Sequence, residues 1–451
     1  MNFSTLPLSI EMLTTLDSLG YKNMTDVQAE ALPLIMEGKD VIAQAKTGSG
    51  KTAAFGIGLL HKLDVKKFRV QSLVLCPTRE LADQVAKELR RIARFQHNVK
   101  ILILCGGESF GKQLGSLEHQ AHIIVGTPGR VLKHLNKSSL DLSDLETLVF
   151  DEADRMLDMG FIEEIESVLE FVPKTRQTLL FSATYDKEIL NVSKKVQRDA
   201  VSVRTVATES ANEITERFYK TDDKTQTFIN ILSTYSPENV IVFTNTKIQA
   251  KELAESLQKV NIDAIAIHGD LEQYERNDVL VQFANKSCPI LVATDVAARG
   301  LDIKELSMVV NLDIPFGDET YTHRIGRTGR AGAKGVAITL YSDYEEEKAQ
   351  EYRNGSRIFA NSNDLKIKIG FEMKPQYVTL VIEGGKKDKI RAGDLLGALT
   401  GEAGLQGASI GKIDIYDRQS YVAIARESIK EAHSKLNKGK IKGKNFSVWI
   451  L

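Results

Sequence analysis

Short apolar runs alternate along the chain with longer segments in which apolar residues recur every three or four positions. A run that is apolar at consecutive positions is typical of a strand covered on both faces. Between the apolar runs Ser72–Leu75 and Ile101–Leu104, the residues Leu81, Val85, Leu89 and Ile92 recur at helical spacing. The pattern predicts a parallel, doubly wound α/β domain over residues 1–205. Its expected strands after residue 70 are Ser72–Leu75, Ile101–Leu104, Ile123–Val125, Leu148–Phe150 and Leu179–Phe181.

The alternation lapses at residues 206–212, which we interpret as a linker, and then starts afresh. A second α/β domain of similar design is expected over residues 213–350. Its predicted strands are Val240–Phe243, Ala264–Ile267, Ile290–Ala293, Val309–Leu312 and Val336–Thr339. Two such domains joined by a short linker make a cleft, so a site on the first can be completed from the second.

From Pro375 the periodicity changes again. From Tyr344 to Lys374 charged residues, Asn, Ser and Gly dominate, which predicts a connector with some helix; we place the connector itself at residues 351–374. Residues 375–451 predict the order β-α-β-β-α-β, a small α+β module that suggests an RNA-recognition fold. Its elements are expected at Val378–Ile382, Ala392–Thr400, Ile410–Tyr416, Tyr421–Ala425, Glu427–Leu436 and Phe446–Leu451.

A glycine-rich loop follows the apolar run Val41–Ala43 and precedes a helical segment. Strand, glycine-rich loop and helix form the context that a phosphate-binding loop needs. Glycines let backbone N–H groups turn toward a phosphate, a lysine supplies a cation for the β- and γ-phosphates, and a hydroxyl can reach Mg²⁺. The alternative is a plain turn before a helix. The loop consists of Ala45, Lys46, Thr47, Gly48, Ser49, Gly50, Lys51 and Thr52.

Carboxylates and hydroxyls follow two later strands of the first domain. Asp151, after the strand Leu148–Phe150, is placed to hold Mg²⁺, and Glu152 to orient and deprotonate an attacking water. The alternative for both is an acidic helix N-terminus stabilised by the helix dipole. Ser182 and Thr184 end the next strand, where they could couple a γ-phosphate to domain closure or could cap a helix.

In the second domain, residues 323–330 gather three arginines and a histidine. Arg327 and Arg330 are predicted one helical turn apart on one face, where their guanidinium groups could stabilise a phosphoryl-transfer transition state. A patch that binds backbone phosphates is the alternative. Asp302 could accept from ribose hydroxyls. Near the N-terminus, Gln28 offers the donor and acceptor that an adenine edge requires, and Tyr21 could stack on the base; a surface glutamine is the alternative.

Composition limits the classes of protein and adds one partner. The formal net charge is −1, but residues 373–451 carry 14 Lys and Arg against 8 Asp and Glu, a net of +6, which leaves −7 elsewhere. A basic tail on an acidic body suggests a polyanion for the tail, unless the charges are only a solvated face. The three cysteines lack metal-ligand spacing, and no secretory signal or membrane-spanning run is evident, so we expect a cytoplasmic protein without a membrane partner.

The sequence Asp151–Asp154 is the signature of the DEAD-box RNA helicases, and the chain resembles that family over roughly residues 3–340. The other family blocks occur in family order: the Gln28 region, Lys46–Thr52, Pro77–Leu81, Gly106–Gly107, Thr127–Arg130, Ser182–Thr184, Phe243–Thr246, Gln273–Arg276, Ala293–Asp302 and His323–Arg330. The resemblance implies two RecA-like domains, RNA-stimulated ATP hydrolysis with Mg²⁺, and non-processive opening of short duplexes.

The resemblance also implies roles for individual residues. ATP would be held by Tyr21, Thr25, Gln28, residues 45–52 and Asp302, with Lys51, Asp151, Glu152, Arg327 and Arg330 catalytic, Mg²⁺ on Thr52 and Asp151, and Ser182, Thr184 and His323 coupling hydrolysis to RNA. Most of the implied RNA contacts suit backbone phosphates, which carry no sequence information. They are Pro77, Thr78, Arg79, Gly107, Thr127, Arg130, Asn245, Gln273, Arg276 and Thr294.

The tail has few of the aromatic residues with which such modules usually stack on bases. Tyr421 is present, but Gln419, Ile424 and Val381 stand at other expected positions, so binding is predicted to depend on basic loops as well. The loop residues named for this role are Lys386, Lys387, Arg391, Lys440 and Lys442. This tail resembles that of the DbpA-type bacterial helicases, which implies a 23S ribosomal RNA hairpin as its target and a role on pre-50S ribosomal particles. We expect a monomer.

Two other functions fit the same motifs. One is a nucleotide-gated RNA clamp or chaperone that separates no strands. The other is a DNA helicase with a related core.

Overall fold

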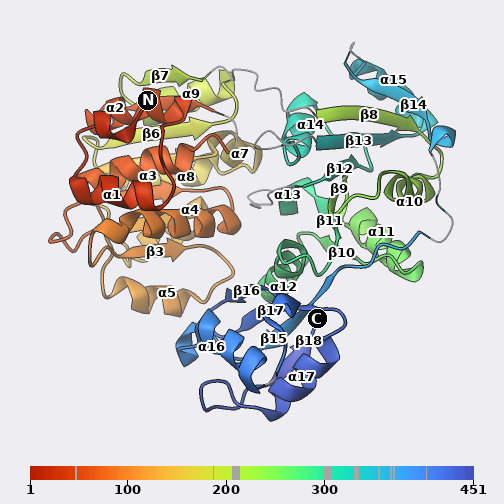
Figure 1. The fold of residues 1–451 in the computed structure, drawn as a ribbon. Coiled ribbons are helices and arrows are strands. Elements are labelled where there is room, and N and C mark those ends of the chain that lie inside the picture. Colours follow the sequence, from red (N-terminus) through yellow and green to blue (C-terminus); the bar gives the residue numbers. More distant parts are fainter. Residues whose placement is uncertain are drawn as a thin grey trace. The chain divides into compact units, whose positions relative to one another are not determined.

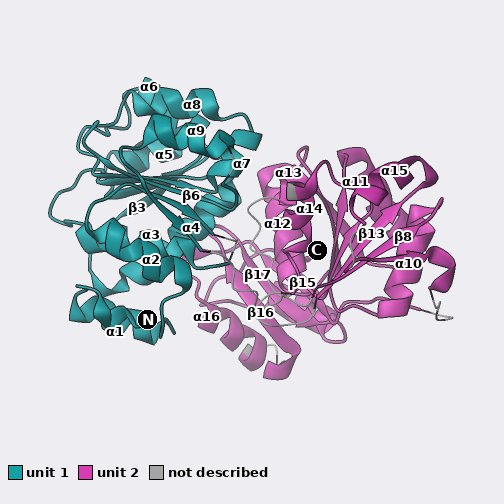
Figure 2. Ribbon diagram, turned by 90° about the horizontal axis from the view of Figure 1, so that it is seen from above, with its two compact units in different colours: residues 1–209, 300–302 teal, residues 210–299, 303–451 magenta. Residues whose placement is uncertain are grey.

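The computed structural model describes residues 1–45, 48–185, 187–205, 214–298, 306–329, 335–353, 356–365, 368, 371–402 and 404–451 (Figure 1). The chain divides into two compact units, residues 1–209 with 300–302 and residues 210–299 with 303–451, coloured separately in Figure 2. They contain two seven-stranded sheets and one four-stranded sheet. This confirms the expected class, two tandem parallel-sheet domains followed by a small α+β module.

The first unit is built on a parallel sheet of order β3-β4-β2-β5-β6-β1-β7. The strands are β1 Val41–Gln44, β2 Ser72–Leu75, β3 Ile101–Leu104, β4 Ile123–Gly126, β5 Thr147–Asp151, β6 Gln177–Ser182 and β7 Val201–Arg204. The helices are α1 Ile10–Ser18, α2 Asp26–Met36, α3 Lys51–Lys62, α4 Arg79–Ile92, α5 Phe110–Leu117, α6 Pro128–Asn136, α7 Ala153–Asp158, α8 Ile162–Leu169 and α9 Lys187–Val196.

Helices cover both faces of this sheet, which explains why its strands are apolar at consecutive positions. In β1, Val41 and Ala43 belong to one hydrophobic core and Ile42 to the other. In β2, Val74 and Leu73 divide in the same way. Side chains alternate along a strand, so two cores require apolar residues at every position.

The second unit begins with a parallel sheet of order β10-β11-β9-β12-β13-β8-β14. Its strands are β8 Ile214–Lys220, β9 Val240–Thr244, β10 Ala264–Ile267, β11 Ile290–Thr294, β12 Met308–Asn311, β13 Gly335–Tyr341 and β14 Ile358–Asn361. Its helices are α10 Lys224–Tyr235, α11 Lys247–Lys259, α12 Gln273–Ala284, α13 Asp295–Ala298, α14 Asp318–Ile325 and α15 Glu346–Glu351. The segment expected to be a connector with some helix contains α15 and a 3₁₀ turn at Ser362–Asp364, together with the strand β14, which was not expected and pairs in parallel with β8.

The tail module, residues 375–451, forms an antiparallel sheet of order β16-β17-β15-β18. It contains β15 Tyr377–Ile382, α16 Ala392–Gly397, a π-helical turn Ala398–Glu402, β16 Ile410–Ile415, β17 Ser420–Ala425, α17 Ile429–Lys438 and β18 Val448–Ile450. The predicted order β-α-β-β-α-β is confirmed, with the bounds shifted by a few residues. The two helices cover one face of the sheet through Leu380, Val422, Leu395 and Leu436.

Candidate functional site

The carboxyl ends of the first sheet's strands carry nearly all of the site residues predicted in that unit. The order β3-β4-β2-β5-β6-β1-β7 divides them into two neighbouring groups. The ends of β5, β6 and β1 carry Asp151, Ser182 and the phosphate loop. The ends of β3, β4 and β2 carry the predicted RNA contacts. Ligands of open α/β sheets bind at this edge, so one sheet offers two adjacent sites.

The phosphate loop has the backbone that its glycines predict. Gly48 and Gly50 have φ angles of 85° and 92°, a region that other residues rarely adopt. A β-carbon on Gly50 would stand 2.4 Å from Nε2 of Gln28. That amide donates to the Gly50 carbonyl at 3.1 Å, while its Oε1 accepts from the backbone N–H of Thr25 at 3.0 Å. Gln28 is thus buried and ties the loop to the start of α2.

The loop ends on a buried lysine that makes no hydrogen bond with the described residues. The Nζ atom of Lys51 and the Oγ atom of Ser49 are buried without a hydrogen-bond partner among the described residues. A buried ammonium without a partner is costly, and a bound phosphate would remove that cost. Burial raises the pKa of the nearby Asp151 carboxyl to about 7, against the attraction of Lys51. A cation beside it would favour the ionised carboxylate.

These residues fit ATP and Mg²⁺ by the chemistry of their donors. Lys51 and the loop amides suit phosphates; the hydroxyl of Thr52 at the start of α3 and the carboxylate of Asp151 are hard oxygen ligands of the kind Mg²⁺ takes. The described residues hold no group of three or more His, Cys, Asp or Glu side chains that could bind a metal. Mg²⁺ is usually held by one or two protein oxygens together with phosphates and water, so this set is sufficient.

Glu152 adopts an unusual backbone conformation. It precedes α7 with φ 55° and ψ 54°, the left-handed region that a non-glycine residue enters at a cost. Its carboxylate accepts from Nη1 of Arg155 at 2.7 Å, and both side chains are buried. The conformation turns the chain sharply between β5 and α7, and Arg155 then fixes the direction of the carboxylate.

Asp154 connects the acidic segment after β5 with the hydroxyl-bearing segment after β6. Its Oδ2 atom accepts from the backbone N–H groups of Ala183 and Thr184, at 3.0 and 3.2 Å. The Thr184 N–H also lies 3.2 Å from Oγ of Ser182. These hydrogen bonds tie the first turn of α7 to the segment after β6.

In the other group of strand ends, Arg79 and Gly107 lie against each other. A β-carbon on Gly107 would lie 1.6 Å from Nη1 of Arg79, and Gly107 has φ 74°. Only glycine leaves room for the guanidinium here. Thr78 caps α4 by accepting from the Leu81 N–H at 3.2 Å, and Pro77 is buried beside it.

Arg130 follows Thr127 at the start of α6. Its Nη1 donates to the Glu108 carbonyl at 3.0 Å and to Oε1 of Gln113 at 2.7 Å. Gln113 is buried and also donates to the Cys105 carbonyl at 2.9 Å. The arginine is therefore held between the segments that follow β3 and β4, and both ends face the same edge of the sheet.

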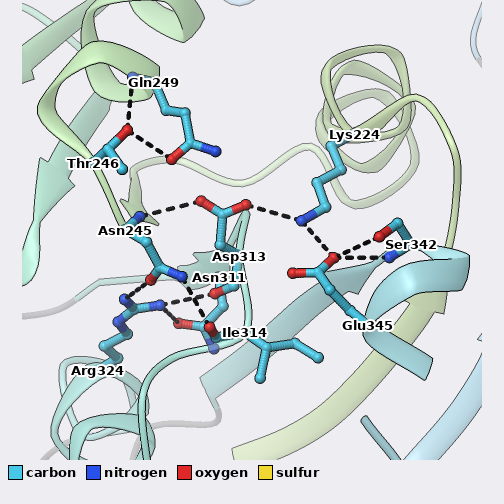
Figure 3. Close-up of polar contacts among 10 residues, drawn as sticks. All are labelled: Lys224, Asn245, Thr246, Gln249, Asn311, Asp313, Ile314, Arg324, Ser342 and Glu345. Atoms are coloured by element: carbon cyan, nitrogen blue, oxygen red, sulfur yellow. Dashed lines mark hydrogen bonds and ion pairs between the residues drawn. The ribbon is translucent and has the colours of Figure 1, made fainter. Parts of the chain in front are cut away.

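In the second α/β domain, buried Arg324 connects the ends of β9, β11 and β12; Figure 3 shows its contacts with Asn245 and Asn311. Its guanidinium donates to both carboxylate oxygens of Asp295, at 2.7 and 2.6 Å, and to Oδ1 of Asn245 at 2.9 Å. It also donates to Oδ1 of Asn311 at 3.3 Å and to the Asp313 carbonyl at 2.9 Å. Asn245 follows β9, and Asp295 follows Thr294 at the end of β11, so two predicted RNA contacts share one support.

Figure 3 also shows Lys224 between two carboxylates. Its Nζ lies 2.9 Å from Oδ1 of Asp313 and 2.8 Å from Oε2 of Glu345. The other oxygen of Asp313 accepts from the Asn245 N–H at 3.1 Å, and Glu345 accepts from Ser342. The network joins α10, β12, β9 and the segment after β13.

The remaining predicted contacts of this domain lie at α12 and α14. Arg276 donates to the Ala297 carbonyl at 3.4 Å, and Gln273 donates to Asn277 at 3.2 Å. The expectation that Arg327 continues a helix with Arg330 is wrong: α14 ends at Ile325 with Gly326 as its cap. Arg327 is buried beyond that end, and Thr328, through its bridge to Leu306, leaves the helical path.

Several other predicted residues have a defined place. Tyr21 donates its hydroxyl to Glu88, and burial raises the pKa of that phenol. Ala45 is buried, and His323 is partly exposed on α14. Lys46, Thr47, Asp302 and Arg330 lie outside the described residues.

The tail's predicted RNA contacts fall into two sets. Lys386, Lys387, Arg391, Lys440 and Lys442 are all exposed. Lys442 donates to the Lys389 carbonyl at 2.9 Å, so the two basic loops lie side by side. Tyr421 is instead buried, and its hydroxyl donates to Asp278 of α12 at 2.8 Å.

Four residues that support the site were not named as functional from the sequence: Asp154, Arg155, Asp313 and Arg324. Arg155 stands three residues after Glu152, a spacing that places the two on one helical face and could have pointed to the pair. Asp154 and Arg324 occur within the quoted motifs, so their presence was visible although their partners were not. Asp313 gave no signal, because its partners Lys224 and Asn245 are distant in sequence.

Comparison with known proteins agrees with this geometry. Residues 25–192 match the DEAD/DEAH box helicase family, residues 223–332 the helicase conserved C-terminal domain, and residues 379–450 the DbpA RNA binding domain. The chain belongs to the DEAD-box ATP-dependent RNA helicases and carries a DbpA-type RNA-binding domain. It is thus an RNA-dependent ATPase and helicase that binds ATP and RNA.

Particular relatives match over most or all of their length. The ATP-dependent RNA helicase DbpA of Escherichia coli (strain K12) is 50% identical, over 100% of this chain and 99% of that protein. The helicase CshA of Geobacillus kaustophilus is 45% identical over 76% of this chain and 74% of its own. A solved structure of Saccharomyces cerevisiae Dbp5 bound to RNA and ADP BeF3 is similar with a TM-score of 0.72 and 31% identity, covering 80% of this chain and 96% of that chain.

Within the described parts of the chain, no helix has both the length and the apolar character needed to cross a membrane.

Proposed function

We propose that the chain uses the energy of ATP to remodel ribosomal RNA locally, with the residue roles that follow. Lys51 and the loop amides bind the β- and γ-phosphates, and Gln28, Thr25 and Tyr21 select the base. Glu152 orients and deprotonates the attacking water, its direction set by Arg155. Mg²⁺ on Thr52 and Asp151 would neutralise charge on the phosphates.

One observation carries the nucleotide half of this proposal. The ammonium of Lys51 is buried without a partner among the described residues, beside a carboxyl whose pKa is raised to about 7. A folded protein rarely retains such a charge unless a ligand meets it. Arg327, Arg330 and Asp302 would be supplied to the same ATP by the second domain when the protein closes, and Ser182, Thr184 and His323 would couple that closure to RNA.

The core RNA contacts suit a strand of any sequence. Arg130 and Asn245 are held by hydrogen bonds to backbone and buried side chains, and the Arg79 guanidinium lies against Gly107; donors of these kinds suit phosphate rather than base recognition. We propose that closing on ATP bends this strand, that the bend is incompatible with a continuous duplex, and that hydrolysis releases it. Opening would then be local and non-processive.

Target choice is assigned to the tail module. The exposed lysines of its two adjacent loops give it the positive surface that RNA binding needs. The similarity to E. coli DbpA over the full length supports a related target, for which we propose a 23S ribosomal RNA hairpin on pre-50S particles. We further propose that the chain acts as a monomer in the cytoplasm.

The test is ATPase stimulation by a panel of ribosomal RNA fragments. The wild-type chain should respond to one hairpin-containing 23S fragment far more strongly than to the others. The variant K386E/K387E should lose that preference while keeping its rate in excess generic RNA. The control K412E/K430E reverses two exposed lysines of the same module outside the two loops and should keep the preference. Equal stimulation by all fragments would refute targeting by the tail.

A further inference from the structure

The segment after β6 reaches past the carboxyl end of β1 to the edge strand β7. In the sheet, β1 lies between these two strands, with Gln44 opposite Ser182 on one side and Arg204 on the other. Tyr185 follows β6 closely, and its hydroxyl donates to Oγ of Ser202 in β7 at 2.9 Å. The Tyr185 side chain therefore bridges the strands on either side of β1, whose end carries the phosphate loop.

Arg204 holds the Tyr185 ring against β7. The central carbon of its guanidinium lies 3.7 Å from the ring centre, which is the geometry of a cation–π contact. Side chains alternate along a strand, so Ser202 and Arg204 share one face of β7, while Val203 packs into the core on the other face. The ring thus lies along the first of these faces, with its hydroxyl on Ser202 and its π face against Arg204.

Gln44, at the end of β1, joins the same two segments by hydrogen bonds. Its Nε2 donates to the Ala183 carbonyl at 3.4 Å. Its own carbonyl accepts from the backbone N–H of Thr205 at 3.3 Å and from the Thr205 hydroxyl at 3.2 Å. The Ala45 N–H donates to the Ser182 carbonyl at 3.0 Å. The start of the phosphate loop is therefore tied both to the segment after β6 and to the end of β7.

Arg204 is exposed and is the last residue of β7. The predicted linker, residues 206–212, begins two positions later. Because Arg204 is exposed, burial of apolar surface does not explain its place on the Tyr185 ring. A cation–π contact at an exposed position is weak, so a small displacement of the segment after β6 is enough to form or to lose it.

We propose that Tyr185 and Arg204 are positioning residues that pass the state of the phosphate site to the start of the linker. A change in what the phosphate loop binds shifts Gln44 and the segment of Ser182 and Thr184, and both lead to the Tyr185 ring. The pair thereby contributes to the difference in RNA affinity between the ATP-bound and the ADP-bound protein. The proposal rests on the coupling proposed for Ser182 and Thr184, but not on a ribosomal target.

The test measures how strongly the bound nucleotide changes RNA affinity. Fluorescence anisotropy of a labelled generic single-stranded RNA gives its dissociation constants with ADP and with ADP–beryllium fluoride, at constant salt, and their ratio is the coupling. R204M removes the cation, and Y185L keeps an apolar side chain but removes the ring. Each should lower the ratio by about threefold, the strength of one exposed cation–π contact. The control R94M removes another exposed arginine of the first unit and should keep the wild-type ratio.

Conservative and double variants separate this role from simple packing. Y185F keeps the ring and R204K keeps a cation, so both should retain most of the wild-type ratio. In Y185L/R204M the ratio should equal that of the single variants, because either change alone already removes the contact. The Tm of R204M should match the wild type, since Arg204 is exposed. An unchanged ratio in R204M, or additive losses in the double variant, would overturn the proposal even if Y185L proves unstable.

A second nucleotide measurement checks the same coupling from the other side. By reciprocity, R204M should reduce the preference for ADP–beryllium fluoride over ADP in saturating RNA by the same factor as it reduces the RNA ratio. S182A/T184A separates the two proposals. If that variant keeps the ratio while R204M lowers it, the hydroxyls lose their proposed coupling role and the Tyr185–Arg204 pair keeps its own. If R204M keeps the ratio, the pair has no such role, whatever S182A/T184A does.

Discussion

The two α/β domains have the same sheet topology, but a lysine at the same place in each has different surroundings. Their orders, β3-β4-β2-β5-β6-β1-β7 and β10-β11-β9-β12-β13-β8-β14, correspond strand for strand. In each, a lysine opens the helix after the strand in the sixth place, Lys51 in α3 and Lys224 in α10. An aspartate lies at the end of the strand in the fourth place or just after it: Asp151 ends β5, and Asp313 stands two residues after β12. Lys51 has no hydrogen-bond partner among the described residues, whereas Lys224 is paired with Asp313 and Glu345.

The difference shows how one fold serves as a site or as a support. In the first domain, the loop has two glycines at positive φ, and the buried lysine after it makes no hydrogen bond with the described residues. In the second, the loop before α10 is Thr221-Asp222-Asp223, with no glycine to turn amides inward, and the lysine neutralises two carboxylates. The charges that would bind phosphate instead hold Asn245 in place.

The largest expected effect on ATP turnover is at Lys51. Replacing it in K51M should lower RNA-stimulated kcat by about 10³-fold, since a preorganised cation at the transferred phosphate is lost. Thermal unfolding of the ATP-free protein should occur at the same or a higher temperature, because a buried charge without a partner is removed. Steady-state kinetics and calorimetry of the same sample measure both. A large fall in Tm would show that Lys51 is structural, like Lys224.

Glu152 should be the next most sensitive position. In E152Q the amide can still accept from Arg155, so the fold and the binding of ATP and RNA should persist, but no base remains and kcat should fall by about 10²-fold or more. Single-turnover hydrolysis with labelled ATP, together with equilibrium binding, separates the two effects. Turnover at the wild-type rate would remove Glu152 from its proposed role.

Lys224 tests the supporting half of the comparison. K224M leaves the buried Asp313 and the half-buried Glu345 without their cation, and should destabilise the second domain by about 2 kcal/mol. Turnover at saturating ATP and RNA should stay near the wild-type value. Urea unfolding and kcat are the measurements. Lost turnover in a folded K224M protein would mean that this network takes part in the chemistry.

The smallest effect is expected at Gly107, which follows β3 and lies among the predicted RNA contacts of the first domain. Gly269, which follows the corresponding strand β10, serves as its control. G107A would force the Arg79 guanidinium away and strain a residue at φ 74°, so RNA affinity should fall by about tenfold. G269A, after β10, meets open space within 4 Å and should bind RNA normally. Fluorescence anisotropy with a single-stranded RNA measures both variants. Equal affinities would show that Arg79 does not need its present position.

Most of the fold could be predicted from local pattern. Runs such as Leu148–Phe150 are apolar at every position because two helical layers cover each sheet, and that requirement is visible in the sequence. Of the strands that were missed, β14 is a partly exposed edge strand of four residues within a segment that is otherwise charged and polar, so its short apolar run Ile358–Ala360 was not recognised. The end of α14 was missed because helical spacing extends past Ile325, while the Gly326 cap and the bridge from Thr328 to Leu306 end the helix.

The site was predictable where chemistry depends on neighbours in sequence. The phosphate loop and Asp151-Glu152 could be recognised from residue type and spacing. The supports do not: Arg324 reaches Asn245 across 79 residues, and Lys224 reaches Asp313 across 89. These pairs meet only because the sheet order brings the ends of β9, β12 and β11 together. Tyr421 illustrates the same limit, since its partner Asp278 lies 143 residues away.

The backbone of Glu152 has a consequence for how its carboxylate can fail. Glu152 adopts left-handed backbone angles, which few residues other than glycine adopt, and these angles set the direction in which its side chain leaves the main chain. Arg155 then binds the carboxylate. The direction of the carboxylate therefore depends on the backbone angles at Glu152 as much as on its side chain. A shortened or branched substitute would relax toward ordinary angles, and would turn the start of α7 along with it.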